Sequence, residues 1–596
     1  MYRVFSLALL LCFSPFALAQ YGLVKIDLNQ VNFGDLAPGG GGGGGAKGGG
    51  GKAPGIKQND PLAQTDGAVW IYGFFELSAA NSKKELEKFQ PVVKGGPSFV
   101  QITHRRWGRE RNYFLFPAIG SIESRYIPKP KILDDFREQN GAAKEPDGYL
   151  RLALWCLTHG LPDKIDGTMG LMKKAGADRP AYVNYNRFKA ELKKPPTADL
   201  PIYEAAELKE QGYRTMDSPE GHFRVYFKAD KENLNDAAVK WRLSRMDETF
   251  NNFYLWFAFQ EYLQDGVHKG LPNPPLPAYR LPVIVENPKD FAKRLKDWGI
   301  PPQGDGFTLR QEGLVMLTSR PTGDICQYLE RNLNPVRGRY PYSVEEYLKG
   351  FPTPEKDGEN VKMVQTLTIL QKIVEDDALT LAINQECTRQ LLSASGFVSR
   401  NVAAPEWIQR GLVSYFETPP NSLYPGFGLP RGSYLEAIRN VHKTLKPGKN
   451  SPRSGDILLN LVSDNYFRQA ASDLRLLREL DLKKALDRKG LQEKAKESHD
   501  LAQATAWSLV YYLAVQRKMH YLTRYAEQLN RLPRHAIVTP QTLQYCFAQA
   551  FDLADVTDPT RLDNHKMQAF AEHWLSYMAN VQVESPELEA FINPAK

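Results

Sequence analysis

Between residues 221 and 417, short apolar runs alternate with longer amphipathic segments, and this alternation constrains the fold more than any other feature. Runs of roughly 4–8 β-branched and aromatic residues are typical of strands, whereas apolar residues at helical spacing are typical of helices. The predicted strands cover residues 221–227, 280–285 and 313–318, and the predicted helices cover 237–259, 288–298, 360–393 and 404–417. This order predicts an α+β domain in which a small mixed sheet precedes two helices.

The regions before and after this predicted α+β domain differ from it in composition. Residues 67–125 contain short apolar runs between turn signals, which favours a small β-rich module. Residues 140–205 have helical periodicity and resemble a single tetratricopeptide-like hairpin, and residues 531–596 continue as C-terminal helices. Residues 20–66 include a glycine-dominated run at 38–55, which predicts a flexible tether because glycine loses the most entropy on ordering.

The first 19 residues have the three parts of a secretory signal peptide. Arg3 supplies the charge, residues 4–13 form an apolar run, and Ala17-Leu18-Ala19 provides a small-x-small cleavage site. We therefore expect cleavage near Ala19 and a secreted or periplasmic protein. Cys12 lies within the apolar run and lacks the small residues that precede a lipoprotein cysteine, so no lipid anchor is expected. No later stretch approaches the ~20 apolar residues of a membrane span.

Charge and cysteine content narrow the class of protein further. Charged residues make up 24% of the chain and the net charge is +8 over 596 residues, which does not by itself indicate a nucleic-acid partner. The four cysteines outside the signal peptide are far apart and form no C-x-x-C pair, which argues against a zinc ribbon and a disulfide-dense scaffold. They are Cys156, Cys326, Cys387 and Cys546. One or two disulfides and buried free thiols both remain open.

Two segments carry the candidate site. The predicted helix at 360–393 contains Gln385-Glu386-Cys387-Thr388-Arg389, and the next predicted helix contains Trp407-Ile408-Gln409-Arg410-Gly411 followed by Leu412-Val413-Ser414-Tyr415-Phe416-Glu417. Both resemble the gluzincin, or peptidase-MA-like, metallopeptidases. Those proteins carry H-E-x-x-H on one helix and W-x-x-E-G-x-A-x-Y-x-E on the next, and the first Glu of the second stretch is the third zinc ligand.

On that pattern, this chain departs from the family at each metal ligand. Gln385 and Arg389 stand at the two His positions and Arg410 stands at the ligand Glu position, while Glu386 keeps the position of the general base. Residues i and i+4 share a helix face, so two His at that spacing can bind one zinc ion. Zinc takes imidazole, thiolate or carboxylate donors, whereas glutamine is a poor donor and arginine has no lone pair to give. The resemblance implies a zinc cofactor, but these residues predict that none is bound.

The same substitutions predict a different kind of site. A buried carboxylate needs a partner, so we expect Arg389, Arg410 or both to pair with Glu386. Cys387 could serve as a nucleophile only with a base beside it, and no His is near in the sequence. No His pair at i,i+4, G-x-S-x-G or phosphate-binding loop occurs elsewhere, and His222 is expected to be half-exposed on a strand face.

The resemblance covers residues 218–530, about half of the chain. The stretches S-x-x-G-H-F-R-V-Y from Ser218, W-F-A at 256–258 and L-P-V-I-V at 281–285 are similar to an uncharacterised domain family of secreted bacterial proteins that is grouped with the peptidase-MA-like proteins. It implies a zincin-like α+β domain with a mainly helical C-terminal part.

Three functions are compatible with these features. The first is a secreted, catalytically inactive relative of a metallopeptidase that binds a protein or peptide partner, because an edge strand can pair with a peptide through backbone groups alone. The second is an active metallopeptidase in which other residues bind the metal and Glu386 activates water. The third is an envelope-associated scaffold in which the glycine-rich tether matters most.

Overall fold

The computed structural model describes most of residues 132–583 and five short stretches before them, namely 19–27, 68–76, 100–104, 112–115 and 123–127. Within 132–583 the gaps are 177–179, 203–204, 230–233, 263–274, 301–303, 311, 341, 345, 347–357, 400–401, 420–425, 446–452, 482–487 and 559–561. The predicted signal peptide, apart from its last residue, and the glycine-rich run at 38–55 lie outside the described residues.

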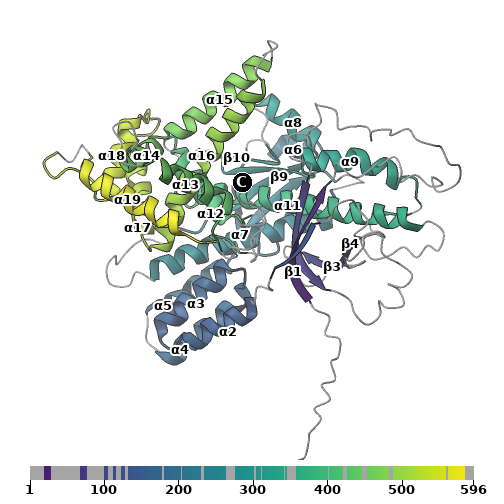
Figure 1. The fold of residues 1–596 in the computed structure, drawn as a ribbon, viewed down its shortest axis with the longest axis horizontal. Coiled ribbons are helices and arrows are strands. Elements are labelled where there is room, and N and C mark those ends of the chain that lie inside the picture. The colour runs from purple at the N-terminus through teal and green to yellow at the C-terminus, as the bar shows by residue number, and fades with distance from the viewer. Residues whose placement is uncertain are drawn as a thin grey trace, which may run out of the picture. The chain divides into compact units, whose positions relative to one another are not determined.

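The chain divides into two compact units. Figure 1 labels many of the helices and strands described below. Unit 1 comprises Met1–Pro130 and Gly323–Asp377, and unit 2 comprises Lys131–Thr322 and Ala378–Lys596. The helix α11 (Gly358–Ala394) supplies its first part to unit 1 and its last part to unit 2. None of the described helices is long and apolar enough to cross a membrane.

Unit 1 holds an antiparallel five-stranded sheet in the order β4-β3-β2-β1-β5. Its strands are β1 (Ala19–Asp27), β2 (Ala68–Glu76), β3 (Val100–His104), β4 (Asn112–Leu115) and β5 (Glu123–Ile127), and the unit also holds α9 (Asp324–Arg337). The sheet includes the strands predicted at 67–125. It differs from the prediction in that 19–27, which the sequence places at the start of the tether, pairs along its whole length with β2.

Unit 2 is built on a second sheet, in the order β10-β11-β9-β8-β7, with β6 pairing to β9. The strands are β6 (Ala198–Asp199), β7 (Arg214–Asp217), β8 (Phe223–Phe227), β9 (Tyr279–Glu286), β10 (Gly306–Leu309) and β11 (Leu314–Thr318). β8, β9 and β11 are parallel, whereas β7 and β10 are antiparallel to their neighbours. The predicted α+β class with a small mixed sheet is confirmed, and the protein is mostly helical.

Alternate residues of the central strands face two different cores, as the two-residue period of a strand requires. Val283 of β9 and Val315 of β11 belong to a large core, whereas Ile284 and Met316, the next residues, belong to a smaller one. The smaller core is closed by α6 (Ala205–Glu210) and α8 (Pro288–Asp297), and the large core by α7 (Asp236–Tyr262) and the end of α11. The sheet therefore has helices on both faces.

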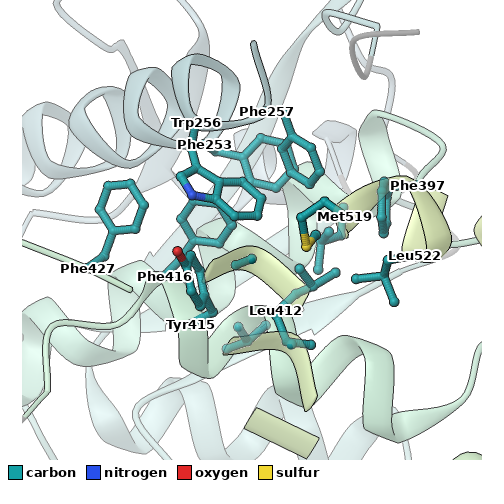
Figure 2. Close-up of a cluster of buried hydrophobic side chains, with 14 of the residues drawn as sticks. Phe253, Trp256, Phe257, Phe397, Leu412, Tyr415, Phe416, Phe427, Met519 and Leu522 are labelled. Atoms are coloured by element: carbon teal, nitrogen blue, oxygen red, sulfur yellow. The ribbon is translucent and has the colours of Figure 1, made fainter. Parts of the chain in front are cut away.

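The large core is rich in aromatic rings where α7 meets α12 (Glu406–Phe416), as Figure 2 shows. The ring centroid of Trp256 lies 5.0 Å from that of Tyr415 and 5.3 Å from that of Phe416, and Phe253 lies 5.3 Å from Phe416. These rings are buried, and each such pair contributes about 0.5–1.5 kcal/mol beyond burial of area. The aromatic stripe of α7 therefore serves as core.

The remaining helices of unit 2 flank this layer. Before the sheet they are α2 (Ile132–Ala142), α3 (Pro146–Thr158), α4 (Ile165–Ala175) and α5 (Pro180–Leu192), with a short 3-10 turn at Pro162–Lys164. After α12 they are α13 (Gly432–Thr444), α14 (Ser454–Val462), α15 (Asn465–Asp481), α16 (Arg488–Val515), α17 (Met519–Asn530), α18 (Pro540–Ala550) and α19 (Asn564–Asn580). The helices α3 and α4 pack as a hairpin, α5 contacts α7, and α16 contacts α12, α13 and α15.

The unit boundaries differ from the predicted domain at 218–530. The sheet takes in β6 and β7, which precede residue 218, because their pairing partners β8 and β9 lie later in the chain. Residues 323–377 group with unit 1, while α18 and α19 group with unit 2 and contact α17 and α14. Local sequence patterns locate the elements but do not show which distant segments they contact.

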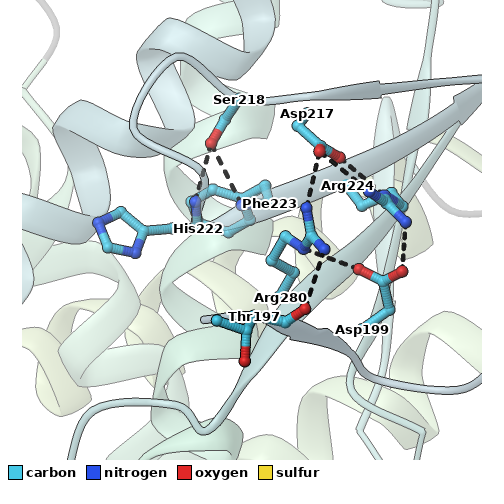
Figure 3. Close-up of polar contacts among 8 residues, drawn as sticks. All are labelled: Thr197, Asp199, Asp217, Ser218, His222, Phe223, Arg224 and Arg280. Carbon is cyan, nitrogen blue, oxygen red and sulfur yellow. Dashed lines mark hydrogen bonds and ion pairs between the residues drawn. The ribbon is translucent and has the colours of Figure 1, made fainter. Parts of the chain in front are cut away.

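Four charged side chains join the strands at one edge of this sheet (Figure 3). Arg224 of β8 pairs with Asp217 of β7, at 2.7 Å from Nε to Oδ1, and with Asp199 of β6. Arg280 of β9 bridges the same two carboxylates, with Nε 2.8 Å from Asp199 and Nη1 2.7 Å from Asp217. The Arg224 guanidinium holds the pKa of Asp217 below its usual range. Two arginines and two aspartates thus connect four strands.

Hydrogen bonds fix the turn that leads into β8. The position of His222 in this turn differs from the predicted one. The Ser218 hydroxyl accepts from the backbone N–H groups of His222 and Phe223 (Figure 3). It donates to the buried carboxylate of Asp247, at 2.8 Å. The prediction that His222 is half-exposed is wrong, because its side chain is buried and its ring stacks on Phe250 at 3.9 Å between centroids. Burial lowers the pKa of this imidazole.

Candidate functional site

The two motif segments form helices that are fixed to the rest of unit 2. The Gln390 side chain of α11 donates to the carbonyl groups of Pro282 and Gly313, which joins the helix to β9 and to the turn before β11. The Ser393 hydroxyl donates to the carbonyl of Arg310, just after β10. These contacts lie within four residues after the motif, so side-chain hydrogen bonds set the register of this part of α11 against the sheet.

The helix α12 is held at its N-terminus and along one face. The Asp464 carboxylate accepts from the backbone N–H groups of Glu406, at 2.7 Å, and Trp407, at 3.1 Å, so it caps a helix that has no cap of its own. A Cβ atom added at Gly411 would lie 2.7 Å from the carbonyl oxygen of Ala506 on α16, a distance that real Cβ atoms do not adopt. Glycine at 411 is therefore required for the close packing of α12 on α16.

Glu386 lies buried beneath the edge strand β10, with a side chain only 3% exposed. The Thr308 hydroxyl of β10 donates to Oε2 of Glu386 at 2.7 Å, and the Arg389 guanidinium forms an ion pair with Oε1. A Cβ atom at Gly306 would lie 2.6 Å from Cγ of Glu386, so glycine permits the strand to approach the carboxylate. Both oxygens of Glu386 are thus engaged by the protein itself.

Gln385 belongs to a separate polar group on the other side of the motif. Its Nε2 donates to Oε1 of Glu417 at 2.8 Å, and Nη1 of Arg431 donates to Oε2 of the same carboxylate at 2.7 Å. The Glu417 side chain is 3% exposed, and the Arg431 guanidinium lies 4.4 Å from the centre of the Tyr434 ring. Gln385 therefore supports a buried ion pair between the end of α12 and the start of α13.

Arg410 pairs with the residue one turn before it rather than with Glu386. Its Nε lies 3.3 Å from Oε2 of Glu406, and Nη2 of Arg310 lies 3.9 Å from Oε1 of the same carboxylate. Burial lowers the pKa of Arg310, and the nearby cations Arg389 and Arg410 lower it further, whereas Glu406 raises it. Arg310 consequently lies within electrostatic reach of both motif helices.

The structure brings the predicted site residues into three adjacent groups instead of one. Glu386 pairs with Arg389, which meets the prediction that Arg389, Arg410 or both would pair with it, and Arg410 pairs with Glu406 instead. Sequence reasoning missed Thr308 and Arg310 because β10, which carries Thr308 and ends just before Arg310, is only four residues long and contains Gly306. Their position beside Glu386 comes from the pairing of β10 with β11, which no local sequence pattern predicts.

These residues do not fit a zinc ion. Arg389 offers only N–H donors, and the Gln385 amide is already bonded to Glu417. Within the part of the chain that the structure describes, no three His, Cys, Asp or Glu side chains gather closely enough to hold a metal. No chemical step that needs a metal is therefore assigned to these side chains.

Cys387, the cysteine within the motif, is a poor candidate for a nucleophile. All four described cysteines are free and buried, which resolves the choice between disulfides and thiols in favour of thiols. Burial, and then the charge of Asp247, raise the pKa of Cys387 well above its ordinary value, and its thiol contacts the carbonyl oxygen of Met246 at 3.8 Å. A thiol kept in this form is a poor nucleophile.

A comparison with known families matches a part of the chain that includes the candidate site residues on α11 and α12. A family model described as "Protein of unknown function (DUF1570)" matches residues 380–534, which run from the end of α11 to just beyond α17. No curated protein and no solved structure matches the chain. Gln385, Glu386, Arg389 and Arg410 all lie within the matched residues. The predicted resemblance to an uncharacterised domain family is thus shown for this part of the chain, and the relation to gluzincins stays a prediction.

Proposed function

We propose that unit 2 is a metallopeptidase-like domain that has lost hydrolysis and binds an extended segment of a protein or peptide, in a secreted or periplasmic protein. The observation that supports this most strongly is the state of Glu386. A general base must face the water from which it takes a proton. Both carboxylate oxygens of Glu386 instead contact Arg389 and Thr308, and the side chain is almost fully buried.

The edge strand β10 supplies a surface for such a ligand. The carbonyl of Asp305 accepts from Thr318 across the β10–β11 pair, so the backbone groups of 305, 307 and 309 face β11. Gly306 and Thr308 consequently direct their N–H and carbonyl groups to the outer edge. Among the described residues no strand pairs with that edge, which is the arrangement that β-augmentation uses.

The surroundings of β10 make its edge rigid. Its Phe307 and Leu309 side chains pack on the smaller core, and Thr308 is bonded to Glu386 on the other face. A strand held on both faces loses little entropy when a peptide joins it, so backbone pairing contributes more of its free energy to affinity. Backbone pairing also tolerates many peptide sequences, so any selectivity for particular side chains must come from contacts outside the strand pairing.

Peptide binding and the absence of cleavage can be tested together. Random twelve-residue peptides displayed on phage would be selected on the purified mature protein, and the selected peptides measured by fluorescence anisotropy. Each selected peptide would then be synthesised with an N-methyl group at one backbone position at a time. β-augmentation predicts loss of affinity at every second position, because alternate N–H groups face the partner strand.

Mass spectrometry of the same peptides after long incubation, with and without added zinc, gives the second half of the test. The proposal predicts intact peptides in both conditions. Cleavage that requires Glu386, or selected peptides whose affinity ignores backbone methylation, would overturn it.

A further inference from the structure

We propose that Arg310 and Arg410, supported by Arg389, form a recognition site for an acidic side chain of the bound peptide. This inference rests on the proposed function, because it assigns the residue that such a peptide must carry. Arg310 directly follows the last residue of β10. A strand advances about 3.3 Å per residue, so a peptide paired with Gly306 and Thr308 reaches Arg310 within about two residues.

Arg310 and Arg410 have N–H donors that their contacts with Glu406 do not use. A guanidinium carries five N–H donors, and both groups share the one carboxylate of Glu406 at 3.3 and 3.9 Å, distances too long for a strong bidentate pair. Their side chains are 36% and 37% exposed, so a ligand can reach them from solvent. By contrast, Arg389 is 18% exposed and is committed to Glu386.

The charges of the cluster are unbalanced in favour of an anion. Three guanidinium groups face two carboxylates, Glu386 and Glu406, and mutual repulsion contributes to the lowered pKa of Arg310. Of the other groups nearby, His499 has its pKa lowered by burial and then by Arg410, which favours the neutral imidazole, and Asp500 beside it is exposed to solvent. An added carboxylate would relieve the repulsion between the arginines.

The planar carboxylate of an Asp or Glu side chain fits this arrangement because arginine binds such groups in a bidentate manner. The cluster also stands at the end of the strand that pairs with the peptide backbone, so one ligand can satisfy both surfaces. Backbone pairing along β10 then gives affinity, and the arginines select an acidic residue at one position of the peptide.

The test compares one selected peptide that contains Glu or Asp with variants in which each acidic residue is replaced by Gln or Asn. We expect one position at which the neutral replacement weakens binding to the mature protein about fivefold, as for a partly exposed ion pair. Arg310→Gln and Arg410→Gln should each weaken binding of the acidic peptide by about the same factor and leave the neutral peptide unchanged. Amidation of the peptide's C-terminus should have no effect.

Two further variants test whether the arginine substitutions act only by damaging the protein or by changing its overall charge. Glu406→Gln removes the competing carboxylate and should tighten binding of the acidic peptide, which a merely damaged protein would not do. Arg151→Gln on α3, an exposed arginine of the same unit, should change neither peptide. If acidic and neutral peptides bind equally and the arginine variants change nothing, the inference is wrong while the proposed function stands. If no peptide binds, the proposed function fails and this inference with it.

Discussion

Removing Arg389 should destabilise unit 2 strongly, because it leaves the buried Glu386 carboxylate without its charged partner. Glu386 would keep only the Thr308 hydroxyl, with its side chain 3% exposed. Breaking a buried pair by removing one partner costs about 3–5 kcal/mol, and the lower end applies because the Arg389 side chain is 18% exposed. We therefore expect Arg389→Met to lower the free energy of unfolding by about 3 kcal/mol.

The double-mutant cycle separates the pair from other effects of the substitutions. Glu386→Gln leaves a guanidinium that can turn toward water, so its cost should be about 1 kcal/mol. In the double variant no charge remains buried, and the cost should again be about 1 kcal/mol, so the two single costs should fail to add by roughly 3 kcal/mol.

Urea denaturation followed by tryptophan fluorescence measures these energies in the relevant part of the protein. Trp256, Trp407, Trp507 and Trp574 are fully buried and all lie in unit 2. The reasoning would be refuted if the destabilisations of the two single variants summed to that of the double variant within about 0.5 kcal/mol, because independent sites add to that degree. So would an Arg389→Met variant as stable as the parent protein.

Three other outcomes follow from the structure. Burial raises the pKa of Asp247 to about 6, so the folded state holds its proton longer than the unfolded state, and stability should fall by up to about 3 kcal/mol as the pH rises from 4 to 6. Urea midpoints across this range should show a shallower fall in Asp247→Asn. Gly411→Ala should cost about 1–3 kcal/mol in the same assay, because its Cβ would strike α16. Arg224→Met should speed hydrogen exchange of β7, because Asp217 loses one of its two arginine partners.

Matched controls define what would contradict these three predictions. Asp297→Asn, at the exposed end of α8, should leave the pH profile unchanged, and an equal change in both aspartate variants would exclude burial as the cause. Gly170→Ala on α4 meets no atom within 4 Å and should be neutral or slightly stabilising. A Gly411→Ala protein as stable as the Gly170→Ala protein would show that α12 can move away from α16. Unchanged exchange in β7 would mean that Arg280 alone holds the strands.

The sequence predicts individual elements well because their periodicity is local. The strand at 280–285 and the helices at 237–259 and 360–393 are observed within three residues of their predicted ends. The same reasoning missed β10, because a four-residue strand that begins with glycine carries little apolar periodicity. Its contribution to the site comes from Thr308, whose hydroxyl meets Glu386 across 78 residues of sequence.

The ion pairs of the site were also predictable only where they depend on neighbouring residues in the sequence. That a buried Glu386 requires a cation follows from elementary electrostatics, and Arg389, one turn away, supplies it. The separation of Arg410 from Glu386 could not be predicted, because it depends on how α12 is capped by Asp464 and packed against α16. These contacts come from residues more than fifty positions beyond the motif, and a family pattern alone does not encode them.

The most direct test of the account is the metal content of the purified protein, measured by elemental analysis before and after treatment with a chelator. Because arginines and a bonded glutamine occupy the positions where the resemblance places zinc ligands, we expect zinc far below one ion per chain and an unchanged urea midpoint after chelation. Near-stoichiometric zinc, together with a fall in the midpoint when the metal is removed, would contradict the account and would make the ion pair of Glu386 and Arg389 a secondary feature of a metal site.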